Sequence, residues 1–372
     1  MPASAAGTIN NNNFLDAAAH EGTTYNGVTY ACMGLSCTYS LADGEYVLGS
    51  DIDISASDGL NIDGVVSIDF NGHKIISNVV NNGAGDNHTA TLTLSGNGGI
   101  AGNLVANGIL NINGGTFGAE DSNGVALNIN DGAEVIINDG KFLSGDAASV
   151  MVMSFTDGLD LTINGGEFKS ANHYGIEVML ESANANMKIS GGTFTGATAG
   201  MQIDWNNSSI ELSGGTFTAT NADGNAIIYD VATGTNSEAA LKGLLVDGYE
   251  YSNATFASGD DYGMVSARIA AANTTVRSIN TVTEEPAVEE EQTTPTTTPT
   301  GSKEDAMEEM SREMEKVIAK GTSNGSTKKA SKKVKAPDTG MTEGAVATSG
   351  ATVLTMATLL GAGVVLKKKY NA

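Results

Sequence analysis

An eight-residue pattern recurs in the middle of the chain, with apolar and polar positions alternating before a pair of small residues. The order is apolar, any, apolar, Asn or Ser, Gly or Asp, Gly, any, Phe, and successive copies begin 25, 26, 26 and 23 residues apart. Such alternation is the period of a half-buried β-strand. The copies are LNINGGTF (110–117), VIINDGKF (135–142), LTINGGEF (161–168), MKISGGTF (187–194) and IELSGGTF (210–217).

Each copy predicts a strand followed by a sharp change of direction. Glycine adopts positive φ angles without steric cost, so the small pair suits a tight turn. A second strand-like run separates the copies, as in GVALNI (124–129), GIEVML (175–180) and GMQIDW (200–205). One phenylalanine follows the turn at the same place in each copy: Phe117, Phe142, Phe168, Phe194 and Phe217.

The repeat predicts a solenoid of the parallel β-helix type. Two or three short strands fill about 25 residues, which leaves no room for crossover helices, and an antiparallel sandwich would not keep one turn chemistry at a fixed period. Stacked coils place equivalent residues in ladders. We therefore expect Asn113, Asn138 and Asn164 to form an amide ladder, continued by Ser190 and Ser213. The phenylalanines should form a column inside the coils, with a ligand-stacking face as the alternative.

These coils resemble the pectate-lyase-like β-helix families, whose coils have a similar length. The resemblance covers about residues 40–280 and implies an all-β, right-handed parallel β-helix, without a catalytic motif. We expect this domain over 46–283, with 1–45 forming an N-terminal cap and the first strands. His73 falls at an early turn, where a catalytic role is the alternative to a structural one.

The charge distribution excludes one class of partner. The chain has 372 residues and a formal net charge of -24, and residues 1–283 hold seven Lys and Arg against about thirty Asp and Glu. Nucleic-acid binding depends largely on cation–phosphate contacts, so no nucleic-acid partner is expected. Acidity mainly favours solubility. No cofactor or metal site is predicted, and weak Ca²⁺ binding is an extra that the acidity allows.

The chain has two cysteines, Cys32 and Cys37, in YACMGLSCTYS. Gly34 lies between them and suits a turn, so we expect a small disulfide loop; the alternative is a pair of free, partly buried thiols. Zinc would need further ligands, and His20 is not at a motif spacing.

The pattern stops after about Thr283, and four further segments follow. The acidic Thr/Pro-rich linker 284–301 is too poor in apolar residues to fold and should form an extended spacer. Residues 302–320 predict a short amphipathic helix, which is either solvated or self-associating. A basic linker covers 321–335. From Ala345 to Leu366 there are 22 residues without a charge, long enough to span a bilayer as a helix.

The last 37 residues, 336–372, resemble the cell-wall sorting signal that sortases read, LPxTG in its common form. The matching residues are Pro337, Asp338, Thr339 and Gly340, while Ala336 stands where leucine is usual. The apolar run 345–366 and the lysines after it complete the three-part order. The resemblance implies that a sortase cleaves after Thr339 and joins it to peptidoglycan. A plain transmembrane anchor is the alternative.

The N-terminal residues show neither the basic region nor the apolar stretch of a signal peptide, so we expect a mature or truncated form. Together these features predict an extracellular protein that is attached covalently to the cell wall after it has passed through the membrane.

The leading functional hypothesis is a non-enzymatic surface protein, an adhesin or carbohydrate-binding β-helix displayed on a stalk. Its expected partners are a sortase, peptidoglycan, and host or microbial glycans or surface proteins. The candidate glycan contacts surround the one tryptophan; the alternative is that this tryptophan closes a coil edge. They are Trp205, Asp204, Asn206 and Tyr229.

The second hypothesis is a polysaccharide lyase or glycosidase. Such an enzyme needs a carboxylate pair, or calcium with a basic residue, at a groove. The available groups are Asp260 and Asp261 with Arg268, or Asp204 beside Trp205. None of them lies in a recognisable motif, so no catalytic residue is assigned.

Overall fold

The computed structural model describes residues 5–81, 88–231, 235–261 and 264–279. They belong to the first of two units of the chain, Met1–Pro286. The second unit, Ala287–Ala372, lies outside the described residues, and with it lie the predicted linkers, amphipathic helix, apolar span and sorting motif. Among the described residues, no helix has the length and apolar character needed to cross a membrane.

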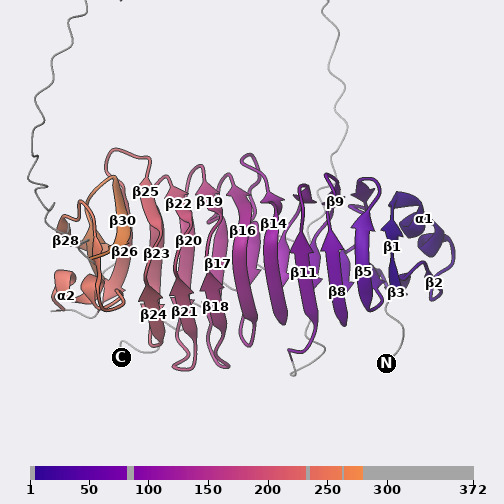
Figure 1. Cartoon of the computed structure of the whole chain (residues 1–372), viewed down its shortest axis with the longest axis horizontal. Helices are drawn as coiled ribbons and strands as arrows, with labels where there is room; N and C mark the ends of the chain where they lie inside the picture. The colour runs from indigo at the N-terminus through magenta and orange to yellow at the C-terminus, as the bar shows by residue number, and fades with distance from the viewer. Residues whose placement is uncertain (1–4, 82–87, 232–234, 262–263, 280–372) are drawn as a thin grey trace, which may run out of the picture. The chain divides into compact units, whose positions relative to one another are not determined.

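Two sheets form the faces of a β-solenoid, whose turns of about 25 residues run between residues 39 and 229 (Figure 1). Each coil gives one or two strands to a 17-stranded sheet and one strand to a 13-stranded sheet. Along the solenoid, neighbouring coils pair in parallel, which confirms the predicted parallel β-helix.

The coil strands in the larger sheet are β5 (Gly44–Leu48), β6 (Ile52–Asp53), β8 (Val65–Asp69), β9 (Lys74–Ile76), β11 (Thr91–Ser95), β12 (Gly99–Ile100), β14 (Ile109–Gly118), β16 (Glu134–Ser144), β18 (Asp160–Ile163), β19 (Glu167–Ser170), β21 (Asn186–Ile189), β22 (Thr193–Gly196), β24 (Ser209–Leu212) and β25 (Thr216–Ala219). Those in the smaller sheet are β7 (Leu60–Ile62), β10 (Val79–Asn81), β13 (Leu104–Ala106), β15 (Leu127–Ile129), β17 (Val150–Ser154), β20 (Tyr174–Leu180), β23 (Ala199–Asn206) and β26 (Asn225–Val231).

The phenylalanines of the repeat form a column inside the coils, as predicted. All five are fully buried. Neighbouring rings stack with centroids 4.5 to 5.0 Å apart. The strand spacing of a parallel sheet is about 4.8 Å, so the backbone pairing itself brings equivalent rings to stacking distance.

The second glycine of each repeat has the backbone conformation that the turn requires. Its φ lies between 97° and 135° in all five copies, a region that side chains with a Cβ rarely adopt. The first position of the pair is free of this constraint, since Asp139 occupies it in one copy. The glycines with positive φ are Gly115, Gly140, Gly166, Gly192 and Gly215.

The predicted amide ladder lies on the outside of the coils. Asn138 Nδ2 donates to Asn113 Oδ1 and Asn164 Nδ2 donates to Asn138 Oδ1, both at 2.8 Å. The Ser190 hydroxyl donates to Asn164 Oδ1 at 2.8 Å and continues the ladder. Since these amides are exposed, the ladder fixes the alignment of the turns rather than filling the core.

The N-terminal end of the solenoid is formed by a helix and hairpins. β1 (Ala5–Ile9) pairs in parallel with β5 of the first coil. α1 (Asn11–Ala19) is capped by Asn10 and buries Phe14, which packs edge-to-face on Tyr39 at 5.2 Å. The strands β2 (Thr24–Tyr25), β3 (Val28–Met33) and β4 (Ser36–Leu41) form antiparallel hairpins. Cys32 and Cys37 face each other across β3 and β4 and form a disulfide.

At the C-terminal end the chain reverses direction. β29 (Met264–Ile269) pairs antiparallel with β26, and β30 (Asn273–Ser278) pairs antiparallel with β25. The short helix α2 (Ser237–Lys242) and the strands β27 (Tyr249–Tyr251) and β28 (Phe256–Asp261) complete this end. The parallel stack therefore ends in antiparallel pairs, an arrangement that the repeat pattern does not predict.

We expect Phe168→Ala to lower the free energy of unfolding by about 3–5 kcal/mol, because it opens a cavity in the middle of the column. Phe168 is stacked on both sides, at 4.9 Å from Phe142 and 4.5 Å from Phe194. Urea denaturation followed by circular dichroism measures the change. Phe155, which is 41% exposed, provides the matched control, and Phe155→Ala should cost far less. Equal costs for the two variants would contradict the role of the column.

Candidate functional site

A groove of about 870 Å³ lies near the C-terminal end of the solenoid, lined by parts of β23, β24, β26 and α2. Its lining combines apolar groups with amide, hydroxyl and carboxylate groups. Pockets that hold small ligands typically have this mixture. The lining includes Asp204, Asn206, Ser208, Tyr229, Asp230 and Leu244.

A β-bulge in β23 places Asp204 at the groove. Val178 on β20 pairs with Ile203, but the next residue, Met179, pairs with Trp205. Asp204 is therefore an extra residue without a partner position on β20. Bulges redirect side chains and are frequent beside functional sites. This bulge places Asp204 among the residues that line the groove.

Asp204 forms a carboxyl pair with Glu177 of the preceding coil. The two side chains are hydrogen-bonded. The Gln202 Nε2 donates to Asp204 Oδ1 at 2.8 Å, so an amide also holds the Asp204 carboxylate in place. Gln202 is only 1% exposed, and its Oε1 is buried without a hydrogen-bond partner. The carboxyl pair thus lies beside Gln202 Oε1, an acceptor to which no donor of the described residues is hydrogen-bonded.

Burial, followed by the neighbouring Asp204 carboxylate, raises the pKa of Glu177 to about 8. At neutral pH the pair therefore shares one proton, as expected for two close carboxyl groups in a poorly solvated place. Burial also lowers the pKa of His173, against a smaller opposing effect of Asp204.

Three of the four predicted glycan contacts line the groove. Asp204, Asn206 and Tyr229 do so. The Asn206 Nδ2 donates to Tyr229 Oη at 3.4 Å, which links the two across neighbouring coils. The side chain of Trp205 is not among those that the structure describes.

Two further residues of this site, Glu177 and Gln202, do not stand out in the sequence. Both occupy outward positions of strand-like runs, and the period of about 25 residues places them side by side, as observed. The bulge, however, gives no sequence signal. The contact between Glu177 and Asp204 could therefore not be predicted from the repeat.

Most of the other proposed catalytic set lies outside the described side chains. The side chains of Asp260 and Asp261 are not described, and Arg268 Nε donates to Ser266 Oγ at 2.8 Å. Within the described residues, no group of three or more His, Cys, Asp or Glu is arranged to hold a metal ion.

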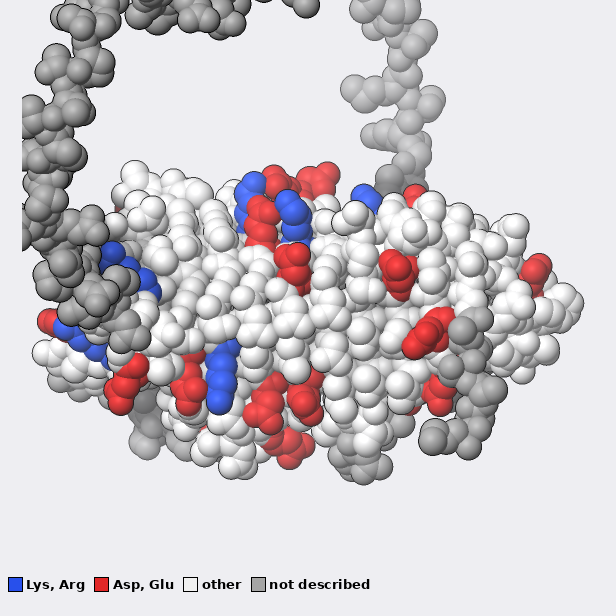
Figure 2. Space-filling view, in the orientation of Figure 1, with Lys and Arg blue, Asp and Glu red and all other residues white. Residues whose placement is uncertain are grey.

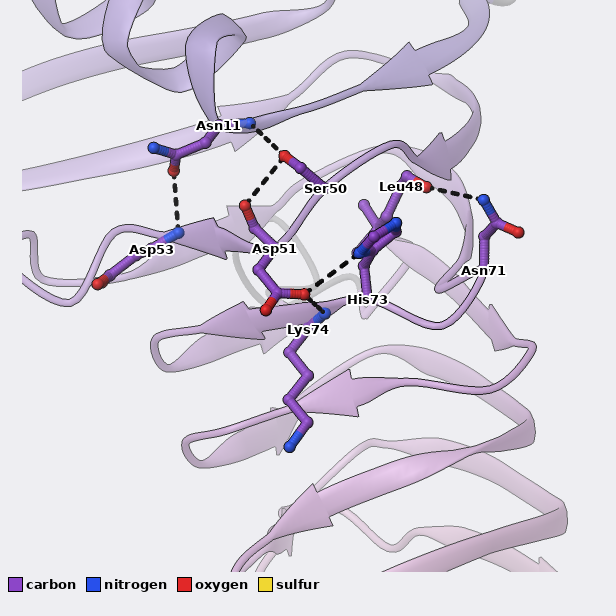
Figure 3. Close-up of polar contacts among 8 residues, drawn as sticks. All are labelled: Asn11, Leu48, Ser50, Asp51, Asp53, Asn71, His73 and Lys74. Atoms are coloured by element: carbon purple, nitrogen blue, oxygen red, sulfur yellow. Dashed lines mark hydrogen bonds and ion pairs between the residues drawn. The ribbon is translucent and has the colours of Figure 1, made fainter.

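His73 lies at a turn between β8 and β9, where it contacts the preceding coil (Figure 3). The Asp51 carboxylate accepts from the Lys74 backbone N–H at 3.0 Å and lies 3.3 Å from His73 Nδ1. Ser50 Oγ accepts from the Asn11 backbone N–H and donates to the Asp51 carbonyl oxygen. These contacts connect α1 with two successive turns of the solenoid. They support a structural role for His73 rather than a catalytic one.

The charges on the face shown in Figure 2 lie mainly toward its rims. Asp and Glu outnumber Lys and Arg there, and the middle of the face carries little charge. Several of the few lysines pair with carboxylates of other coils, for example Lys141 with Glu167 at 3.0 Å and Lys169 with Glu120 at 2.8 Å. Exposed pairs of this kind contribute little stability.

No protein-family model matches this sequence, and neither the curated proteins nor the solved structures contain a match to the chain.

We expect the free energy of unfolding to fall as the pH rises from about 4.5 to 8. Glu177 takes up a proton more readily in the folded state than in the unfolded state, where its pKa is near 4.5. Its stabilising contribution is therefore complete below about pH 4.5 and is lost as the pH rises through about 8.

Urea denaturation at a series of pH values tests this expectation. Glu177→Gln should flatten the fall, whereas Glu134→Gln, a change at an exposed carboxylate on β16, should leave it unchanged. A wild-type profile as flat as that of Glu177→Gln would show that Glu177 is ionised like an ordinary surface glutamate.

Proposed function

We propose that this protein is a non-enzymatic, saccharide-binding β-solenoid displayed at a bacterial cell surface. The groove beside the bulge carries the proposal, because Asp204, Asn206 and Tyr229 meet there. A sugar ring has hydroxyl groups around an apolar ring face, and the groove offers acceptors and donors next to apolar side chains. Tyrosine suits such a ligand because it presents both an apolar ring and a polar hydroxyl group.

The geometry of the carboxyl pair favours binding over hydrolysis. Glycosidases hold their two carboxyl groups about 5 to 9.5 Å apart, to leave room for a sugar or a water molecule between them. Glu177 and Asp204 are instead hydrogen-bonded to each other. No Lys or Arg is among the described residues that line the groove, whereas a lyase that acts on polyuronates favours a basic cleft.

A polysaccharide lyase or glycosidase is the second candidate. One observation favours it: Glu177 keeps its proton at neutral pH and so has the protonation state of a general acid. Release of reducing ends or unsaturated products from a polysaccharide panel would support this candidate over the first.

Display at the cell surface rests on the C-terminal sequence. In this proposal a sortase thiol attacks the Thr339 carbonyl carbon, the Thr339–Gly340 bond breaks, and Thr339 is joined to an amine of peptidoglycan. The proline extends the peptide for a binding groove, and Gly340 allows close approach of the enzyme. The Thr/Pro-rich segment 284–301 would then separate the solenoid from the wall.

We expect the full chain to bind members of a glycan array and Asn206→Ala to weaken that binding about fivefold or more. The change removes a neutral hydrogen-bonding group, whose loss typically costs about 1 kcal/mol. Asn172→Ala provides a control outside the groove, because Asn172 is an exposed amide whose side chain donates to Asp146 Oδ1. An array signal that Asn206→Ala leaves unchanged would remove this groove as the binding site.

For the anchoring step we expect mass spectrometry of wall digests to find a peptide that ends at Thr339 and carries a cross-bridge remnant. Thr339→Ala should move the protein from the wall fraction to the membrane fraction or the medium. An intact C-terminus in the membrane fraction of cells that make the wild-type chain would refute covalent anchoring.

A further inference from the structure

Three side chains, Glu177, Asp204 and Gln202, meet at the bulge beside the groove, and of these Asp204 is among the residues that line it. Glu177 and Asp204 share one proton, and Gln202 Nε2 supplies one donor to Asp204. The Gln202 Oε1 is buried without a hydrogen-bond partner in the described part of the chain. A buried acceptor without a donor is unfavourable, so the corner that these three side chains form is set up to receive a group that donates several hydrogen bonds.

We propose that this corner binds the primary ammonium group of a ligand, so that the saccharide of the proposed function is an amino sugar with a free amine. The inference rests on that proposed function and specifies its ligand. An ammonium group has three N–H donors and a positive charge. Its natural acceptors here are the carboxylates of Glu177 and Asp204 and the carboxamide oxygen of Gln202.

The charge around the groove agrees with a cationic ligand. Asp204 and Asp230 are both among the residues that line it, and none of the lining residues that the structure describes is Lys or Arg. A cationic ligand therefore meets no like charge among the lining side chains. Charge-assisted hydrogen bonds to carboxylates are among the stronger polar contacts in proteins.

An ammonium group fits this corner better than a divalent metal ion does. Ca²⁺ takes six to eight oxygen ligands. The corner offers two carboxylates and one amide, and no cluster of three or more His, Cys, Asp or Glu that could hold a metal ion occurs in the described part of the chain. Three acceptors match the three N–H groups of an ammonium ion without further ligands.

Binding should release a proton. Burial and then Asp204 raise the pKa of Glu177 to about 8, so the empty pair carries one proton at pH 7. The ammonium ion takes the place of that proton, which passes to the buffer, and both carboxylates become ionised. Affinity for an amine that stays protonated over this range, such as the side chain of Nα-acetyl-lysine amide, should therefore rise between pH 6 and pH 8.

The neighbouring titratable groups do not obscure this release. Burial lowers the pKa of His173, which therefore stays neutral over most of this range. On the flanking coils, β17 (Val150–Ser154) has no titratable side chain, and β26 contributes Tyr229 and Asp230.

Isothermal titration calorimetry on the full chain tests the inference with oligomers of glucosamine and of N-acetylglucosamine. We expect the free amine to bind at least tenfold more tightly. Titration of Nα-acetyl-lysine amide, whose side-chain amine is fully protonated at pH 7, in two buffers of different ionisation enthalpy should show close to one proton released for each molecule bound. Glu177→Gln should abolish the release and weaken amine binding at least tenfold. Glu134→Gln should change neither quantity.

The possible outcomes separate this inference from the function on which it rests. Equal affinities for the two oligomers refute the ammonium site and leave saccharide binding in place. Binding of Nα-acetyl-lysine amide, whose side-chain amine is free, but of no saccharide, supports the ammonium site and refutes the saccharide function. Binding of CaCl₂ but of no amine overturns the inference in favour of a metal. Failure of every probe refutes both proposals.

A second variant keeps the test valid if Glu177→Gln does not fold. Asp204→Asn removes the other carboxylate and should also weaken amine binding at least tenfold, while circular dichroism confirms the fold. Amine binding that Asp204→Asn leaves unchanged overturns the inference.

Discussion

The stacking of one coil on the next is the constraint on which the rest of this structure depends. A single coil of about 25 residues cannot bury its own apolar side chains, since its strands are only a few residues long. The parallel backbone pairing sets a spacing of about 4.8 Å. The stacked Phe rings, with centroids 4.5 to 5.0 Å apart, match this spacing. Backbone pairing and core packing therefore require the same register.

The bulge at Asp204 is informative because it departs from that register. Elsewhere on these strands a residue meets its equivalent on the next coil, as Val150 meets Ile176 and Ile176 meets Met201. One extra residue in β23 breaks this match and brings a carboxylate of one coil against Glu177 of another. The surrounding coils hold the bulge in place, so a poorly solvated carboxyl pair persists in an otherwise regular sheet.

The sequence predicts the features that repeat and misses those that interrupt the repeat. Phe142 and Asn138 could be placed, the first in the core and the second in an outer ladder, because Phe recurs at one position of every copy and Asn or Ser at another. The pairing of Glu177 with Asp204 could not, since an inserted residue shifts the register without leaving a mark in the composition. The reversal at β29 and β30 was also missed, because those strands lie beyond the last copy of the octet. The groove residues Asp204, Asn206 and Tyr229 can be proposed from the sequence only because they lie near the one tryptophan of the chain or on the next strand-like run.

The two different ends have a consequence for how a protein of this kind can change in size. The hairpins and α1 complete the first coil, and the antiparallel strands β29 and β30 complete the last, while the backbone of every coil between them pairs only with that of its neighbours. Duplication of one 25-residue segment within the stack would lengthen the solenoid by one strand spacing, about 4.8 Å, without a new end structure. Such a gene could lengthen or shorten its product in whole coils while the groove and its carboxyl pair stay at the same distance from the C-terminal end.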